Sequence, residues 1–207
     1  MNASVRGSAR HYLVALRALF ILTVALGIAY PFGITAIAQA AMPAQANGSL
    51  TSLHGKVVGS ALIGQSFSRA DGTAIPGWFQ PRPSAAGDGY DALASGGSNL
   101  AGSNPELRAA ENRRAAAIEK AGGVFREQIP ADALTASASG LDPHISPAYA
   151  LLQVHGVAVA RGMNEAQVRR LVTAKIQGRD LGYLGEPTVN VLELNIALAR
   201  LDPAGNK

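Results

Sequence analysis

Two short segments carry side chains whose types and spacing could do chemistry. The first is Asp142-Pro143-His144, which places a carboxylate two residues from an imidazole, as a general-base pair would need. A hydrolase would also need a nucleophile and a third group to orient the base, and no such motif accompanies the pair. A rigid surface turn is therefore favoured over a hydrolytic site built on Asp142 and His144.

The second segment is the glycine-containing run Ser95-Gly96-Gly97-Ser98-Asn99. Glycine lets successive backbone N–H groups converge on an anion, so this run is a candidate anion-binding nest. Its five residues form the one candidate binding site in the sequence. The run lacks a strand before it and a helix immediately after it, so a plain surface loop is the competing interpretation.

Several classes of chemistry are excluded by what the sequence lacks. The chain has no cysteine, which excludes disulfides, thiolate zinc sites and thiol catalysis. The pair Gly55-Lys56 has neither the upstream glycine nor the following Ser or Thr of a phosphate-binding P-loop. No HExxH sequence and no close histidine pair suggests a metal site. We therefore predict a domain with no catalytic residues, metal or cofactor of its own, which must act through a partner.

A long apolar segment lies near the N-terminus, and its identity decides where the rest of the chain is located. Only 15% of the 207 residues are charged, and Ala18 to Leu53 holds none of them. Residues 13–38 are long enough to cross a bilayer as a helix. Pro31 predicts a kink near Ala29–Phe32. A cleaved signal peptide with a site at Ala36-Ile37-Ala38 is the alternative, but the apolar stretch exceeds the about 7–15 residues of a signal core.

The basic residues flanking this helix predict its orientation. Arg6, Arg10 and Arg17 precede it, whereas the next basic residue is Lys56. The positive-inside rule then makes residues 1–12 a cytoplasmic tail and exports the chain after about residue 40. Without these three arginines the rest of the chain is nearly neutral. The net charge of +4 is thus a topology signal, and we expect no nucleic-acid partner.

The exported part is predicted to be a connector over 39–53, an α+β domain over 54–202 and a short tail over 203–207. Asn47-Gly48-Ser49 fits a glycosylation sequon but is interpreted as a turn. Strands are expected at Lys56–Val58 and Ala61–Ile63, and a long loop from Gln80 to Pro105. Capping residues Asn104, Ser146 and Asn164 open helices. The expected helices span 105–120, 147–161, 165–176 and 189–201.

The order of these segments resembles the small C subunit of the Kdp-type high-affinity potassium-transporting ATPase of bacteria. Eight blocks carry the resemblance, and they occur in the right order along almost the whole chain. The blocks are AYPFGITAIAQ (Ala29–Gln39), QANGSL (Gln45–Leu50), GKVVGSALIGQSF (Gly55–Phe67), FQPRPSAAGDGYD (Phe79–Asp91), ASGGSNLAGSNPEL (Ala94–Leu107), LTASASGLDPHISPAYALLQV (Leu134–Val154), VAVARG (Val157–Gly162) and LGYLGEPTVNVLELNIAL (Leu181–Leu198). The departures, such as Ala101 and Ala138 where the family commonly has glycine, are small.

This resemblance implies an accessory subunit of the bacterial inner membrane, with one membrane helix and an extracytoplasmic domain. Its partners would be a channel-like subunit that binds K⁺ and a P-type subunit that hydrolyses ATP, beside the lipid bilayer. Family members support assembly and stability of the complex. They have also been assigned a catalytic-chaperone role that raises the ATP affinity of the hydrolysing subunit. In that role Ser95, Gly96, Gly97, Ser98 and Asn99 resemble the signature loop of ABC transporters.

The predicted topology conflicts with direct contact between this loop and ATP. The three N-terminal arginines place Ser95–Asn99 outside, whereas ATP is cytoplasmic. We therefore expect an assembly role, with any effect on ATP transmitted through helix contacts. The resemblance implies that K⁺ is the ion transported by the complex, and that ATP is used by the hydrolysing subunit. The alternative function is an exported ligand-binding protein whose signal peptide is cleaved.

Overall fold

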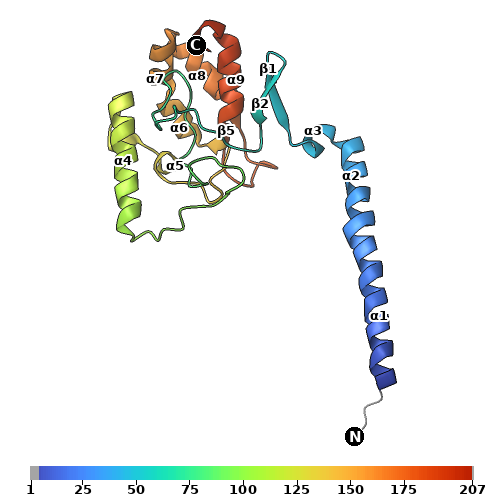
Figure 1. The fold of residues 1–207 in the computed structure, drawn as a ribbon. Coiled ribbons are helices and arrows are strands. Elements are labelled where there is room, and N and C mark those ends of the chain that lie inside the picture. Colours follow the sequence, from blue (N-terminus) through green and yellow to red (C-terminus); the bar gives the residue numbers. More distant parts are fainter. Residues whose placement is uncertain (1–4, 207) are drawn as a thin grey trace. The chain divides into compact units, whose positions relative to one another are not determined.

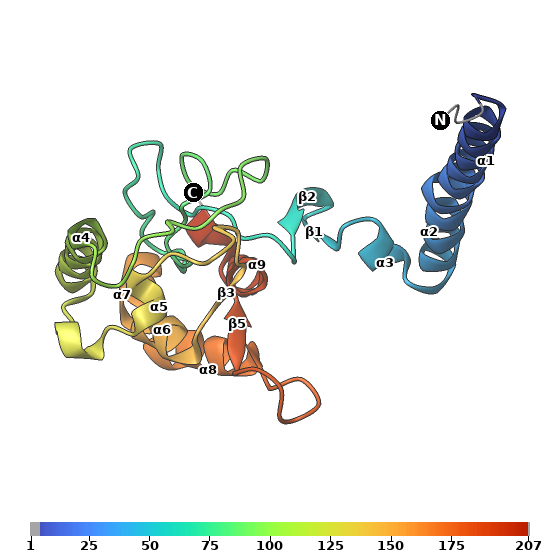
Figure 2. The same ribbon diagram turned by 90° about the horizontal axis from the view of Figure 1, so that it is seen from below.

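The computed structural model describes residues 5–206 of the chain. Contacts between residues divide it into two compact units, Met1–Ser49 and Leu50–Lys207. The first is helical, and the second combines small sheets with helices (Figures 1 and 2). The predicted fold class, an N-terminal apolar helix followed by a small α+β domain, is confirmed.

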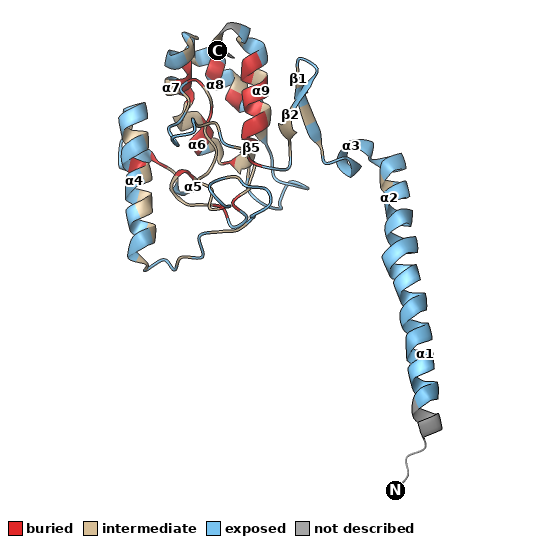
Figure 3. Cartoon of the chain, in the orientation of Figure 1, coloured by how far each residue is buried: buried red, intermediate tan, exposed pale blue. Residues whose placement is uncertain are grey.

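The first unit is dominated by one long apolar helix, here called the anchor helix. It comprises α1 (Val5–Val24), a π-helical turn (Ala25–Ala29) and α2 (Tyr30–Ala41). Ala9–Ala41, with a mean hydropathy of 2.2, is the one helix among the described residues that is long and apolar enough to cross a membrane. Its side chains are almost all exposed within the chain (Figure 3). This pattern fits a helix whose surface is covered by lipid or by other helices.

The irregularity that Pro31 was expected to cause lies just before the predicted position. Proline has no N–H, and its ring clashes with the carbonyl four residues earlier in a regular helix. The π-helical turn Ala25–Ala29 widens the backbone there, and the N–H of Tyr30 donates to the carbonyl of Ala25. Such single π-turns absorb a local mismatch while the helix continues.

A short helix, α3 (Pro43–Ala46), follows the anchor helix. The side chains of Gln39 and Asn47 exchange two hydrogen bonds of 3.2 and 3.0 Å, and Asn47 also donates to the carbonyl of Pro43 at 2.7 Å. The sequon asparagine therefore forms a turn that ties α3 to the end of α2, as the sequence predicts.

The second unit contains two small antiparallel sheets. One is the hairpin β1 (Leu50–Leu53) and β2 (Lys56–Ser60). The other has the order β3-β5-β4, from β3 (His144–Ile145), β5 (Thr188–Asn190) and β4 (Ile176–Gln177). The strand expected at Ala61–Ile63 is wrong, because the chain turns there and Asn190 donates to the carbonyl of Ala61 at 2.8 Å.

Helices are the main regular structure of the second unit. They are α4 (Pro105–Gly122), α5 (Ala131–Leu134), α6 (Pro147–Leu152), α7 (Val154–Arg161), α8 (Glu165–Ala174) and α9 (Val191–Leu201), with 3₁₀ turns at Arg126–Gln128 and Pro203–Asn206. The predicted caps are confirmed, since Asn104, Ser146 and Asn164 each accept a hydrogen bond from a backbone N–H of the first helical turn.

The helix expected over 165–176 ends at Ala174, because Ile176 belongs to β4, and two further helix boundaries are wrong. The single helix expected over 147–161 is broken at Gln153, whose side chain pairs with both backbone groups of Gln80 at 2.6 and 3.1 Å. The last helix begins at Val191 rather than residue 189, because Val189 and Asn190 belong to β5. Both changes come from partners far away in the sequence.

The core lies between α6, α7, α8, α9 and the three-stranded sheet, where Figure 3 shows the buried residues gathered. Its largest fully buried apolar side chains are Phe79, Ile145, Leu194, Leu198, Val154, Val168, Val172 and Val189. Helix α4 contributes only Ala115 to the buried residues, so it is the surface helix that its thin apolar stripe predicts.

Candidate functional site

The candidate binding loop is held by a neighbouring segment, residues 137–143. This segment is itself fixed by Ser84, whose hydroxyl donates to the carbonyl of Gly140 at 2.7 Å and accepts from the N–H of Tyr90 at 2.8 Å. Gly140 adopts a left-handed φ of +68°, which glycine reaches without strain. The turn therefore offers its neighbouring carbonyls to the candidate loop.

Residues Ser95 to Gly97 pack directly against this segment. The Ser95 hydroxyl and the Gly96 N–H both donate to the carbonyl of Ser139, each at 2.9 Å. A Cβ atom on Gly97 would lie 2.9 Å from the carbonyl oxygen of Ala138. Close backbone packing thus explains Gly97, whereas the nearest atom to a Cβ on Gly96 would be the Ala94 carbonyl oxygen at 4.0 Å.

The remaining residues of the loop face outward. Ser98 and Asn99 are exposed, and Asn99 has a left-handed φ of +52°. The next helix, α4, begins only at Pro105, so no helix N-terminus adds its dipole to the loop. Because the Gly96 N–H already bonds within the chain, fewer N–H groups of Ser95–Asn99 are available than a full anion-binding nest would use. Nucleotide or anion binding by these five residues stays a prediction.

The second candidate, Asp142 with His144, forms a local turn beside Arg82. Asp142 accepts from the Arg82 guanidinium at 3.1 Å and from the His144 N–H at 2.9 Å. The His144 ring nitrogen Nδ1 is 3.6 Å from the carboxylate, beyond hydrogen-bond range. Partial burial acts to raise the pKa of Asp142, but the nearby His144 ring, the His144 N–H and the charge of Arg82 outweigh it and lower that pKa.

This geometry suits a structural carboxylate better than a general base. Asp142 is ionised and its oxygens bond to groups that shape the turn, as Asx turns do. Among the described residues, no group of three His, Asp or Glu side chains could hold a metal ion. The contacts of Asp142 and His144 therefore support the rigid turn over the hydrolytic alternative.

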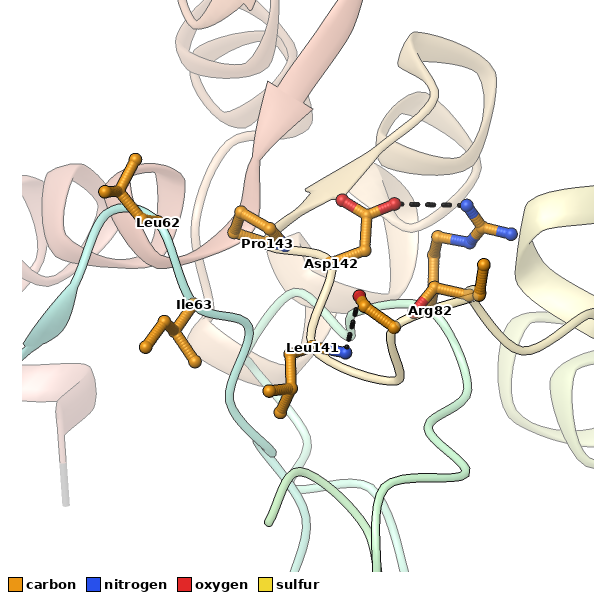
Figure 4. A pocket seen from close by; sticks show the side chains of 9 residues that line it. Leu62, Ile63, Arg82, Leu141, Asp142 and Pro143 are labelled. Carbon is orange, nitrogen blue, oxygen red and sulfur yellow. Dashed lines mark hydrogen bonds and ion pairs between the residues drawn. The ribbon is translucent and has the colours of Figure 1, made fainter. Parts of the chain in front are cut away.

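A shallow hollow of about 550 Å³ opens beside Asp142 (Figure 4). Asp142 points toward Arg82 there, while Leu62, Ile63 and Leu141 supply an apolar border. Leu62 and Ile63 are 63% and 40% exposed, although the sequence placed them in a strand. Gly64 locks this segment to the turn, because its N–H donates to the carbonyl of Leu141 at 2.8 Å.

A more prominent apolar surface was missed by the sequence reasoning. Residues 178–187, here called the apolar loop, project from the sheet between β4 and β5 (Figure 2). Leu181, Tyr183 and Leu184 are 81%, 69% and 49% exposed. An ion pair of 2.7 Å between Arg179 and Glu186 closes the base of the loop. Clustered exposed apolar side chains of this kind mark contact surfaces for partners.

Comparisons with known proteins identify the family. The family described as "K+-transporting ATPase, c chain" (KdpC) matches residues 12–200, which include most of the anchor helix. A potassium-transporting ATPase KdpC subunit of Kineococcus radiotolerans is 47% identical over 205 residues, covering 98% of this chain and all of that protein. The KdpC subunit of Beijerinckia indica is 50% identical, covering 91% and 93%. That of Gemmatimonas aurantiaca is 53% identical, covering 90% and 92%.

A single apolar helix joined to a small α+β domain with exposed apolar loops is the architecture of a membrane-associated subunit. The chain belongs to the KdpC family of K⁺-transporting ATPase c chains. The resemblance predicted from the eight sequence blocks is thereby confirmed.

Proposed function

We propose that this chain is an accessory subunit of an ATP-driven complex that takes up K⁺ with high affinity. The family match over residues 12–200 is the observation that carries the proposal. The relatives are named as subunits of potassium-transporting ATPases and align over nearly their whole length. The predicted lack of catalytic residues in this chain fits a subunit that supports catalysis performed elsewhere.

The partners we propose are a channel-like subunit that binds K⁺ and a P-type subunit that hydrolyses ATP. The anchor helix would contact their membrane helices, because its side chains find almost no cover within this chain. The apolar loop would contact a partner outside the membrane, because Leu181 and Tyr183 are exposed and apolar. These two contacts would stabilise the assembled complex.

The proposed location is the inner membrane of a bacterium, with a single pass and a cytoplasmic N-terminus. Arg6, Arg10 and Arg17 support this orientation through the positive-inside rule. The α+β domain would then lie outside. The cleaved-signal alternative is not favoured, because the family match begins within the helix and not after it.

We further propose that any effect on ATP affinity is indirect. The Ser95–Asn99 loop would lie on the other side of the membrane from cytoplasmic ATP. Replacing Ser98 and Asn99 by alanine should then change the apparent ATP affinity of the complex by less than about twofold, below 0.5 kcal/mol. A loss of tenfold or more, with the complex intact, would reinstate direct nucleotide binding by this loop.

Growth at low external K⁺ tests the proposed function. A strain that lacks this chain but retains the two partner subunits should fail to grow at micromolar K⁺ and should recover when the chain is supplied. Normal growth at millimolar K⁺ serves as the control for general fitness. Full growth of the deletion strain at micromolar K⁺ would contradict the proposal.

A further inference from the structure

A second hollow, separate from the Ser95–Asn99 loop, is larger than the one beside Asp142. This groove of about 860 Å³ lies between α4, residues 66–83 and helices α6 and α7. Its volume is within the range of small-molecule sites, about 300–1,000 Å³. Apolar walls come from Ile75, Trp78, Ile118, Leu152 and Val157. The groove therefore has the size and the apolar surface that a small organic ligand needs.

Small side chains occupy part of the α4 face that lines the groove. Arg114, Ala117, Ile118 and Ala121 recur at the spacing of one helical face. Two alanines on this face leave space between the helix and the core. Arg114 stands at one end of the face, so the space along α4 ends at a positive charge.

The charged residues that line the groove are all basic. They are Arg82, Arg114 and Lys120, and no described acid is among the lining residues. Arg82 pairs with Asp142, but neither Arg114 nor Lys120 forms an ion pair with a described carboxylate. Arginine and lysine stay protonated near neutral pH. Of the three cations, only Arg82 forms an ion pair with a described carboxylate, whereas the Arg114 guanidinium donates to the carbonyl of Leu134 at 2.6 Å.

One buried polar atom at the groove, Arg82 Nε, has no hydrogen-bond partner among the described residues. Tyr149 also lines the groove and is only 5% exposed. Burial raises the pKa of Tyr149, so the hydroxyl stays protonated and can donate. Buried polar groups are normally satisfied, and an unsatisfied donor on a cavity wall indicates a missing acceptor.

A glycine in α7 keeps the groove open. Gly156 lines it, and a Cβ atom built there would meet nothing within 4 Å. Glycine inside a helix costs about 0.5–1 kcal/mol relative to alanine. Among the described residues, no steric contact explains this glycine, and a need for open space in the groove is consistent with it.

We propose that this groove binds an amphipathic organic anion, with a single negative headgroup facing Arg114 and Lys120 and an apolar body along Trp78 and Ile118. These two cations match the headgroup, and the apolar walls match the body. Two sources share this chemistry, namely a lysophospholipid or fatty-acid anion from the membrane and a soluble aromatic acid. This site goes beyond the proposed assembly function and does not depend on it.

Two probes test the proposal with the full chain in zwitterionic phosphatidylcholine nanodiscs. Naphthalene-1-sulfonate, followed by calorimetry, represents the soluble source. Oleoyl-lysophosphatidylglycerol, compared with the neutral lysophosphatidylcholine by native mass spectrometry, represents the membrane source. We expect at least one of the two anions to bind, and the one that binds more tightly identifies the source. If neither anion binds up to about 1 mM, the proposal is overturned.

Variants locate the binding in the groove. The double variant Arg114→Gln, Lys120→Gln should lower the affinity for the probe by about tenfold, as expected for losing a charged hydrogen bond. Arg113→Gln removes the same charge from α4 at an exposed position outside the groove, and should leave the affinity unchanged. Gly156→Leu should abolish binding by filling the space, whereas Tyr149→Phe should weaken it. Equal affinities across all these variants would overturn the proposed site.

Discussion

At the residue scale, one carbonyl group organises the candidate loop. Ser139 accepts from both the Ser95 hydroxyl and the Gly96 N–H at 2.9 Å. Gly97 lies directly against the same segment. The loop is therefore a packed part of the domain surface, and the shape of Ser98–Asn99 depends on the contacts of the residues before them.

A Gly97→Ala substitution tests this packing. The new Cβ atom would lie 2.9 Å from the Ala138 carbonyl, so the backbone must shift. We expect the free energy of unfolding to fall by about 1–3 kcal/mol. Gly102→Ala is the matched control, since its Cβ atom would meet open space. Thermal unfolding of both variants in detergent measures the difference, and equal melting temperatures would show that Gly97 is not closely packed.

Asp142 makes a pH-dependent contribution to stability. Its pKa in the folded chain is lowered relative to the unfolded chain. The contribution is therefore present above the unfolded pKa of about 4 and is lost as the pH falls through the folded value. Asp142→Asn should lower the melting temperature at pH 7, and the difference from the parent should shrink below about pH 4. Asp88→Asn, at an exposed position, is the control. If the melting-temperature difference between Asp142→Asn and the parent stays constant across this pH range, ionised Asp142 does not stabilise the fold.

Local and distant residue contacts differ in how far the sequence predicts them. The caps at Asn104, Ser146 and Asn164 were predictable because donor and acceptor lie within three residues. By contrast, Asn195 bonds to both backbone groups of Phe79, 116 positions away, at 3.0 Å each. The Asn195 amide thus forms with the Phe79 backbone the two hydrogen bonds that a neighbouring strand would otherwise supply. Nothing in the local pattern of an asparagine inside an apolar helix indicates such a partner.

At the element scale, the apolar loop is the surface that most needs a partner. Leu181 also has a left-handed φ of +52°, which is costly for a leucine. Leu181 is 81% exposed, so most of its apolar surface is not buried within this domain. We therefore infer that its role is contact with another subunit.

Substitution of the loop should impair assembly without unfolding the domain. Leu181→Asn with Tyr183→Ser removes the apolar surface, and asparagine tolerates the left-handed backbone. We expect recovery of the complex with a tagged partner subunit to fall about tenfold or more, as for a contact hot spot. Leu93→Ser is the control, because Leu93 is 98% exposed on a different loop. Unchanged recovery with the double variant would exclude the loop from the interface.

The proposed orientation of the anchor helix predicts the side of the membrane on which each element lies. Because the chain has no cysteine, single cysteines can be introduced at Ser8 and Ser98. A membrane-impermeant maleimide added to spheroplasts should label Ser98→Cys and spare Ser8→Cys until the membrane is permeabilised. The opposite labelling pattern would place the Ser95–Asn99 loop beside cytoplasmic ATP and would support its direct role.

The sequence predicts long elements better than short ones. The anchor helix and the helices α4, α8 and α9 follow from apolar periodicity and caps, because helical contacts are local. The two-residue strands β3 and β4 exist only because β5 lies between them, and no periodicity of two residues can reveal that. The exposed positions of Leu62 and Leu181 also depend on the packing around them, so the candidate contact surfaces could not be predicted.

At the scale of the whole molecule, the chain is a helix that finds no cover in its own fold, joined to a domain with its own core. The buried residues all lie in the second unit among those described, whereas the first unit exposes its apolar side chains. The exposed apolar surface of the anchor helix fits a covering of lipid or of other helices. Membership in the KdpC family indicates which partners we propose.

We propose above all that this chain holds a K⁺-transporting ATPase together. The most direct test purifies the complex through a tag on the ATP-hydrolysing subunit, from cells with and without this chain, and measures the recovered channel-like subunit and the K⁺-stimulated ATPase activity. We expect the recovered channel-like subunit and the ATPase activity each to fall at least about tenfold without the chain. A tenfold fall corresponds to losing about 1.4 kcal/mol of assembly free energy. Full recovery of the channel-like subunit and of the activity without the chain would contradict this proposal.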